Sequence, residues 1–201
     1  CCCVFAGFSL NAQDWKLEKN SQGVKIYTRH IAGWGIKEFR GVVQVKTTLK
    51  EVEALLRNAP ARSQWMHNTV NTRDIKVASS GEIYSYSVID VPWPATDRDN
   101  VTKMHYKYNL PKEFTVELSA ADGIEAENSC CVRITRMNGY WKAVDLGNGY
   151  VEITQQAVAD PGGSIPDWMA NSSVIDSPFN TLLNMKNRLE AAIMSKKIFG
   201  D

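Results

Sequence analysis

The feature that most constrains the fold is a series of strand-length segments in which apolar and polar residues alternate. Such alternation is typical of strands with one buried face, and turn pairs such as Ser80-Gly81 and Asn138-Gly139 separate many of the segments. So many consecutive strands with short links predict an antiparallel meander. The segments are residues 24–29, 36–45, 72–78, 82–88, 100–109, 113–120, 129–137, 141–145 and 150–158.

Helical patterns interrupt this series once and then end it. Thr48 and Glu51 fit an N-terminal capping box before leucines at helical spacing, and a second short helix is expected at 61–65. From Pro166 onward, apolar residues at helical spacing form one strong face, and Pro178 predicts a kink or break in it. A long amphipathic helix buries such a face across the sheet. The sequence therefore predicts an α+β domain in which the space between helix and sheet is either filled or a pocket.

Length and charge exclude several classes of protein. A chain of 201 residues can bury a sizeable core, or enclose a cavity, within one domain. Lys and Arg number 23 against 22 Asp and Glu, which gives a net charge of +1, and the longest basic cluster is Lys196-Lys197. Nucleic-acid binding and a polybasic membrane tether both need a clear basic surplus, so neither is predicted.

Residues 1–13 differ from the rest because they carry no charge and place apolar side chains among small ones. This composition resembles the end of a secretory signal peptide, with cleavage near Ala12 or Gln13. A signal peptide would make the mature protein periplasmic or secreted. An ordinary apolar N-terminal segment would leave it cytoplasmic, and a lipid-modified cysteine is a third interpretation. The folded domain is expected at 14–195, followed by a C-terminal tail at 196–201.

The five cysteines predict neither a disulfide framework nor a metal site. Three of them are the first three residues, and the other two are the adjacent pair Cys130 and Cys131. Because neighbours on a strand point to opposite faces, no bond between Cys130 and Cys131 is expected. C-x-x-C spacing is absent and the three histidines are scattered, so no zinc site and no other cofactor is predicted.

Strand alternation also predicts which side chains face the interior. Segment 100–109 is the clearest case, because its apolar face must look inward while Lys103, His105 and Lys107 face solvent. The inward set is rich in Tyr and Met, which suits a wet or ligand-filled interior; the alternative is an ordinary core in which each tyrosine hydroxyl finds a partner. The candidate cavity residues are Tyr84, Tyr86, Val88, Thr102, Met104, Tyr106, Tyr108, Phe114 and Val116 on the strands, and Ile175, Phe179 and Leu182 on the helix.

Two stretches resemble motifs of the StAR-related lipid-transfer (START) domain family. Residues 91–101, VPWPATDRDNV, are similar to its W-P-x-x-x-R-D-x-V segment. Residues 160–171, DPGGSIPDWMAN, are similar to its D-P-x-G-x-I-P-x-W-x-x-N segment, which leads into the C-terminal helix. Trp15, residues 23–27 and Arg62-x-x-Trp65 also fit, so the resemblance covers roughly residues 14–195 and indicates a minimal, bacterial-type member.

The resemblance implies a helix-grip fold, in which a curved antiparallel sheet wraps around a long C-terminal helix and leaves an internal hydrophobic tunnel. It implies binding of a single lipid or similar hydrophobic molecule, for transfer or sensing, with transient membrane contact and without catalysis. Pro92, Trp93 and Pro94 would form a gate loop at the tunnel mouth, where Trp93 acts as a gate, touches a membrane or packs beneath the loop. Arg98 and Asp99 are expected to be structural, each with a partner, because a buried unpaired charge is costly.

The chain departs from the sterol-binding members of that family. They carry an Arg six residues beyond the Arg of R-D, paired with an acid, whereas this chain has Met104 at that position. The difference favours a more apolar or differently polar ligand, anchored by tyrosine hydroxyls.

An enzyme is the main alternative to a binding protein. Related helix-grip proteins include cyclases and hydrolases, and Tyr84, Tyr86, Tyr106 or His67 could act as acid or base. The sequence holds no G-x-S-x-G elbow, H-E-x-x-H motif or glycine-rich phosphate loop. Binding is therefore the favoured hypothesis, and a sensor domain whose interface responds to a ligand is a third class that stays open.

Overall fold

The computed structural model describes residues 14–163 and 165–199. They form one antiparallel sheet in the order β1-β2-β3-β10-β9-β7-β6-β5-β4, and the short strand β8 pairs in parallel with β6. The signal-peptide segment expected at 1–13 lies outside the described residues. The elements are β1 (Lys16–Ser21), β2 (Val24–Arg29), β3 (Glu38–Lys46), α1 (Leu49–Arg57), α2 (Ala59–Arg62), β4 (Thr69–Ser79), β5 (Glu82–Ile89), β6 (Arg98–Asn109), β7 (Glu113–Ala120), β8 (Val132–Ile134), β9 (Arg136–Gly147), β10 (Tyr150–Asp160) and α3 (Asp167–Phe199).

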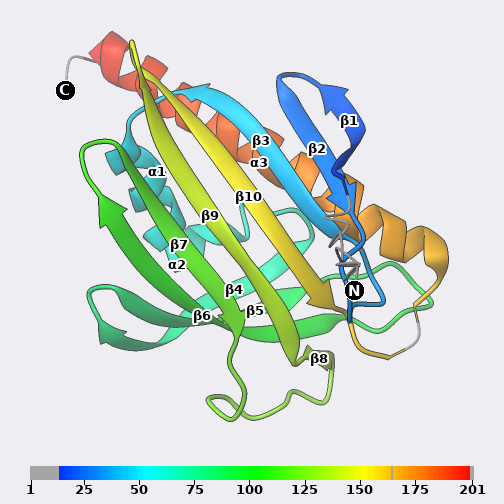
Figure 1. The fold of residues 1–201 in the computed structure, drawn as a ribbon. Coiled ribbons are helices and arrows are strands. Elements are labelled where there is room, and N and C mark those ends of the chain that lie inside the picture. Colours follow the sequence, from blue (N-terminus) through cyan, green and yellow to red (C-terminus); the bar gives the residue numbers. More distant parts are fainter. Residues whose placement is uncertain (1–13, 164, 200–201) are drawn as a thin grey trace, which may run out of the picture.

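The long helix α3 lies across the curved sheet, behind strands β3 and β10 in the view of Figure 1. Helix α3 packs against β1, β2 and β3, whereas α1 contacts β9 and α2 contacts β4. The helices therefore all cover one face of the sheet, and α3 packs along the edge formed by β1–β3. This arrangement confirms the predicted α+β, helix-grip architecture.

The core between α3 and the sheet comes from alternate residues of the strands, as the sequence pattern predicts. Leu182 of α3 is fully buried and fits against Gly41 of β3, where an added Cβ would lie 2.4 Å from the Leu182 Cδ1 atom. Helix and strand approach closely here because residue 41 has no side chain. The buried core residues in this region are Val24, Ile26, Val43, Val45, Val151, Ile153, Phe179, Leu182, Met185 and Leu189.

The three helix predictions have different outcomes. The short helix expected at 61–65 exists as α2 but spans Ala59–Arg62, because Pro60 is accommodated in its first turn. The capping box at the start of α1 is confirmed, because Glu51 N donates to Thr48 Oγ1 at 3.3 Å and Thr48 N donates to Glu51 Oε2 at 3.1 Å. Pro178 does not break α3, which runs to Phe199, so the residues predicted as a tail from 196 are helical up to that point. A proline removes only one backbone hydrogen bond, and buried apolar residues on both sides of Pro178 keep the two halves of the helix packed.

Two strand predictions also need correction. The sequence pattern misses β1, because the residues KLEKNS have no apolar alternation and only the pairing with β2 makes them a strand. The segment expected at 129–137 divides into β8 and the start of β9, and residues 129–130 form a turn instead. This turn changes the geometry of Cys130 and Cys131.

Gly139 offers a test of the packing between β9 and β10. A Cβ at this position would lie 2.4 Å from the Gln156 carbonyl oxygen and 2.7 Å from the Ala157 Cβ atom. We expect Gly139→Ala to lower the free energy of unfolding by about 1–3 kcal/mol in urea denaturation, because backbone atoms must move to admit the methyl group. Gly35→Ala is the matched control, since a Cβ there meets nothing within 4 Å. Equal midpoints for the two variants would contradict this account of the packing.

Candidate functional site

Arg98 ties together the two sequence motifs. Its guanidinium is buried and donates from Nε to the Pro161 carbonyl at 3.2 Å and from Nη2 to the Gly162 carbonyl at 3.1 Å. Nη1 donates to the carbonyl of Thr96. The start of β6 is therefore bonded to the loop that precedes α3. This contact sets where the helix begins its path across the sheet.

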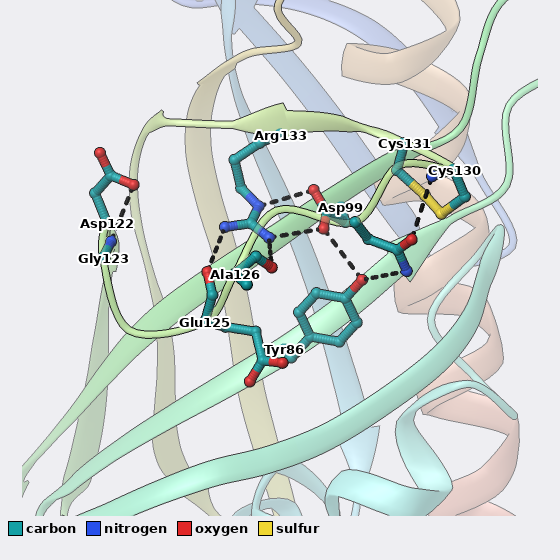
Figure 2. Close-up of polar contacts among 10 residues, drawn as sticks. Tyr86, Asp99, Asp122, Gly123, Glu125, Ala126, Cys130, Cys131 and Arg133 are labelled. Atoms are coloured by element: carbon teal, nitrogen blue, oxygen red, sulfur yellow. Dashed lines mark hydrogen bonds and ion pairs between the residues drawn. A yellow bond between two sulfur atoms is a disulfide. The ribbon is translucent and has the colours of Figure 1, made fainter.

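Asp99 anchors a second loop from the opposite face of β6. The buried carboxylate accepts hydrogen bonds from Nε and Nη2 of Arg133, both at 2.8 Å, and one from the Tyr86 hydroxyl at 3.1 Å, as Figure 2 shows. Arg133 also donates to the carbonyls of Glu125 and Ala126, so the β7–β8 loop is held against the sheet. The hydrogen bonds from Arg133, with that from Tyr86, hold the pKa of the Asp99 carboxyl below its usual range although burial acts in the other direction.

The prediction that Cys130 and Cys131 do not bond to each other is wrong. Their sulfur atoms form a disulfide in the β7–β8 loop (Figure 2). The prediction assumed strand geometry, in which neighbouring side chains diverge, whereas this segment is a turn. Asn128 joins the turn to the Asp99 cluster, because its Oδ1 accepts from Cys130 N at 3.2 Å and its Nδ2 donates to the Tyr86 hydroxyl at 3.5 Å.

A cavity with two lobes lies between α3 and the concave face of the sheet. Each lobe has a volume of about 210 Å³, and the two share wall residues from β3, β5, β10 and α3. The inner lobe extends toward α2 and has a mixed wall, which includes Arg62, Trp65, His67, Ser85, Ser87, Asn100, Thr102, Met104, Trp141, Gln155, Ser173, Ser177 and Thr181. The outer lobe is more apolar and is lined by Ile36, Val91, Arg98, Ile134, Ile165, Met169 and Val174 among others. The shared wall consists of Phe39, Ile89, Ala157, Ser173 and Ser177.

On β6, Thr102 and Met104 lie on the cavity wall, together with Asn100. On β5 the predicted face is wrong: Tyr84, Tyr86 and Val88 are not wall residues, and Ser85, Ser87 and Ile89 take their place. The register explains the inversion, because Ser85 pairs with Thr102 and Ser87 pairs with Asn100 across β5 and β6. The two tyrosines lie on the other face, where Lys and Arg side chains cover their rings.

Four further candidates lie outside the cavity. Phe114 and Val116 belong to the buried core, and Tyr106 is buried with its ring 3.9 Å from the Arg57 guanidinium. Tyr108 is 44% exposed, and its hydroxyl hydrogen-bonds to Glu53 and Arg57 of α1. These residues do not line the cavity, because α1 covers this end of the sheet and fills the space above them.

The predicted helix face is also wrong for the cavity. The Lys19 Nζ atom lies 4.0 Å from the centroid of the Phe179 ring, and Leu182 lies against Gly41. Both helix residues therefore pack on the edge formed by β1–β3. Ile175 is likewise absent from the wall of either lobe. On the helix side, the inner lobe is lined instead by Ser173, Ser177, Pro178 and Thr181, and the outer lobe by Met169 and Val174 with the two shared serines. The strongest apolar stripe is buried against the sheet, and the smaller side chains next to it leave the space open.

The polar helix residues of the cavity wall were not among the predicted site residues, although their spacing in the sequence could have indicated them. Ser173, Ser177 and Thr181 recur every four residues and so share one side of the helix. Small polar side chains at this spacing, beside a strong apolar stripe, indicate a helix face that does not pack tightly.

The loop between β5 and β6 lies beside the N-terminal end of α3 (Figure 1). Trp93 is 90% exposed there, which excludes the interpretation that it packs beneath the loop. Pro92 and Pro94 are also exposed, and Val91 lines the outer lobe. On the helix side Trp168 is 55% exposed, next to Met169, which also lines the outer lobe. Two exposed indoles therefore flank this end of the cavity.

Neither a metal site nor a membrane span is found in the described part of the chain. Residues 14–163 and 165–199 contain no group of three His, Cys, Asp or Glu side chains suited to hold a metal ion. Over the same residues, none of the helices combines the length and apolar character needed to cross a bilayer.

An antiparallel sheet that closes on a C-terminal helix around a partly polar cavity defines the helix-grip class of ligand-binding domains. The model of the START domain family matches residues 4–192 of this chain. The chain belongs to this family, which is known for binding lipids and other hydrophobic ligands.

Individual relatives agree with the family match. A STAR-related lipid transfer protein from Xanthomonas axonopodis has a crystal structure that is 36% identical, with a TM-score of 0.80 over 87% of this chain and 98% of that one. A protein of Pseudomonas aeruginosa named as uncharacterized is 35% identical over 179 residues, which is 89% of this chain and 88% of the relative. Human StAR-related lipid transfer protein 5, at 16% identity, shares the fold with a TM-score of 0.78 over 88% of this chain and 86% of that one.

The Asp99 cluster generates a pH-dependent prediction. Replacing Asp99 with Asn leaves the buried Arg133 without its charge partner, so we expect the free energy of unfolding at neutral pH to fall by roughly 3 kcal/mol. Because the folded pKa of Asp99 is lowered, the difference from the wild type should be complete above about pH 4 and should shrink as the pH falls below that value. Denaturant titrations at several pH values measure it, with the exposed Asp90→Asn as control. A difference that does not change with pH would contradict the ion-pair account.

Proposed function

We propose that this protein binds one lipid or similar hydrophobic small molecule in the two-lobed cavity. The observation that carries the proposal is the cavity itself, which continues from a partly polar inner lobe to an apolar outer lobe. The two lobes together fall within the ~300–1,000 Å³ typical of small-molecule sites. Membership of a family known for binding hydrophobic ligands supports the same function.

Binding without catalysis is part of the proposal. General acid–base catalysis needs titratable groups within reach of a bound substrate, yet no Asp or Glu is among the described residues that line either lobe. Tyr84, Tyr86 and Tyr106 do not line the cavity, and burial raises the pKa of Tyr106 to about 12. His67 does line it, with its Nε2 atom 3.4 Å from Asn180 Nδ2. These facts favour a carrier or sensor over a cyclase or hydrolase.

Transient contact with a membrane is the proposed route for ligand exchange. Trp93 and Trp168 flank the outer lobe, and indole side chains favour the interface between lipid and water. The net charge of +1 gives no strong electrostatic anchor, which suits brief contact. A periplasmic or secreted location belongs to the same proposal, and the Cys130–Cys131 disulfide supports it because disulfides persist in oxidising compartments.

Filling the cavity tests ligand binding. Ser177 lines both lobes, so Ser177→Phe should reduce the fraction of delipidated protein that forms one-to-one complexes with a bacterial lipid extract by at least about tenfold. Native mass spectrometry measures the bound fraction. Ser195→Phe, on the exposed end of the same helix, should bind as the wild type does. If the wild type forms no complexes, the proposed function fails.

Trp93 tests transfer separately from binding. We expect Trp93→Ala to slow lipid transfer between vesicles at least about fivefold, with the bound fraction in native mass spectrometry unchanged, because the indole contacts the membrane and not the cavity-bound ligand. Leu110→Ala is the control, because Leu110 is 61% exposed in the β6–β7 turn, at the other end of β6. Unchanged transfer by the Trp93 variant would remove the support for a membrane-contacting role.

A further inference from the structure

Four side chains on the wall of the inner lobe have buried polar atoms that lack a hydrogen-bond partner among the described residues. They are Arg62 Nη2, Trp65 Nε1, Asn100 Oδ1 and Gln155 Oε1. Arg62 and Trp65 are only 4% and 1% exposed. Buried polar groups in folded proteins almost always have hydrogen-bond partners, because a buried donor or acceptor without a partner costs more free energy than a typical hydrogen bond contributes. Four such atoms around one cavity therefore indicate a ligand that supplies the missing hydrogen bonds.

These four side chains surround the same lobe from different elements. Arg62 Nη1 donates to Ser85 Oγ at 2.5 Å, and Ser85 pairs with Thr102, two residues from Asn100 on β6. On the other side, the Trp65 ring meets the ring of Trp141 edge-on, with centroids 6.0 Å apart. Trp141 pairs with Gln155 across β9 and β10. We call Arg62, Trp65, Asn100 and Gln155 the polar ring of the inner lobe.

The charge on Arg62 already has a partner. Arg62 Nη1 lies 3.3 Å from Asp74 Oδ1, and Ser85 Oγ bridges the two by donating to the same carboxylate oxygen. An anionic ligand would place a second negative charge beside a matched pair that is largely removed from water, which is unfavourable. The lobe therefore favours an uncharged polar group.

Hydrogen-bonding complementarity narrows the ligand further. Arg62 Nη2 and Trp65 Nε1 are donors and need an acceptor, whereas the oxygens of Asn100 and Gln155 are acceptors and need a donor. A hydroxyl or a primary amide supplies both in one small group. The outer lobe, with Ile134, Val174 and similar residues on its wall, suits the apolar remainder of the molecule.

We propose that the ligand is a neutral amphipathic lipid whose hydroxyl or amide end binds within the polar ring and whose apolar part extends into the outer lobe. This inference rests on the proposed lipid-binding function and names the chemical class of its ligand. It replaces anchoring by tyrosine hydroxyls, because the predicted tyrosines do not line the cavity.

A series of sixteen-carbon probes with different end groups tests the inference on the full chain. We expect hexadecan-1-ol and hexadecanamide to bind at least about tenfold more tightly than palmitate at pH 8 and than hexadecane, measured by native mass spectrometry titration. Palmitate binding as tightly as hexadecanol would overturn the neutral-ligand assignment. Equal binding of all probes, hexadecane included, would overturn the polar ring while leaving the proposed function intact. Binding of none would overturn both.

Asn100→Leu separates a ligand-binding role from a structural one. Replacing an amide whose buried oxygen has no partner with an apolar side chain should leave the unliganded protein at least as stable as the wild type. The preference for hexadecanol over hexadecane should fall by at least about threefold. Asn138→Leu, an exposed asparagine on β9, is the matched control and should retain the full preference. An unchanged preference in Asn100→Leu, confirmed with Gln155→Met, would contradict the proposal.

Discussion

The contact between Arg98 and the carbonyls of Pro161 and Gly162 is the constraint on which the cavity depends. It bonds the start of β6 to the loop before α3, while the other end of the apolar helix stripe is pressed onto β1–β3. A helix held in this way spans the concave face of the sheet without closing onto β5 and β6. The space that remains is the two-lobed cavity. The motifs at residues 91–101 and 160–171 therefore act together, because the hydrogen bonds between them keep this space open.

The distribution of side-chain size explains why this space is a cavity and not an extended core. Long apolar residues of α3, such as Leu182 and Met185, are buried, whereas Ser173, Ser177 and Thr181 face the lobes and are too short to reach the opposite wall. The serines of β5 do the same from the sheet side. Well-packed interiors leave few such voids, and buried groups without partners lower stability. Residues that both leave a void and leave buried polar groups without partners are expected where function, and not stability, determines which amino acid is present.

The sequence predicts the meander, the capped helix, the long C-terminal helix and the family, because each depends on local periodicity or on a motif. It also predicts the face of β6 that carries Thr102 and Met104. The face of β5 could not be predicted in the same way, since tyrosines suit either side of a sheet and only pairing with β6 decides between them. The polar ring could not be predicted from the sequence either. Arg62, Asn100 and Gln155 belong to distant segments, and only the folded chain shows that each has a buried polar atom without a hydrogen-bond partner among the described residues.

The proposed ligand orientation has a consequence for exchange with a membrane. A lipid in a bilayer presents its polar end to water and keeps its apolar part inside. If the polar end binds deepest, in the ring around Arg62, it must enter the cavity first and the apolar part must leave the bilayer last. The mouth then has to stay on the membrane until uptake is complete. The exposed Trp93 and Trp168 beside the apolar outer lobe are placed to maintain such contact, because indoles favour the interface and the wall behind them is apolar. The division of the cavity into a polar inner lobe and an apolar outer lobe thus accounts for both the ligand class and the position of the aromatic residues at its mouth.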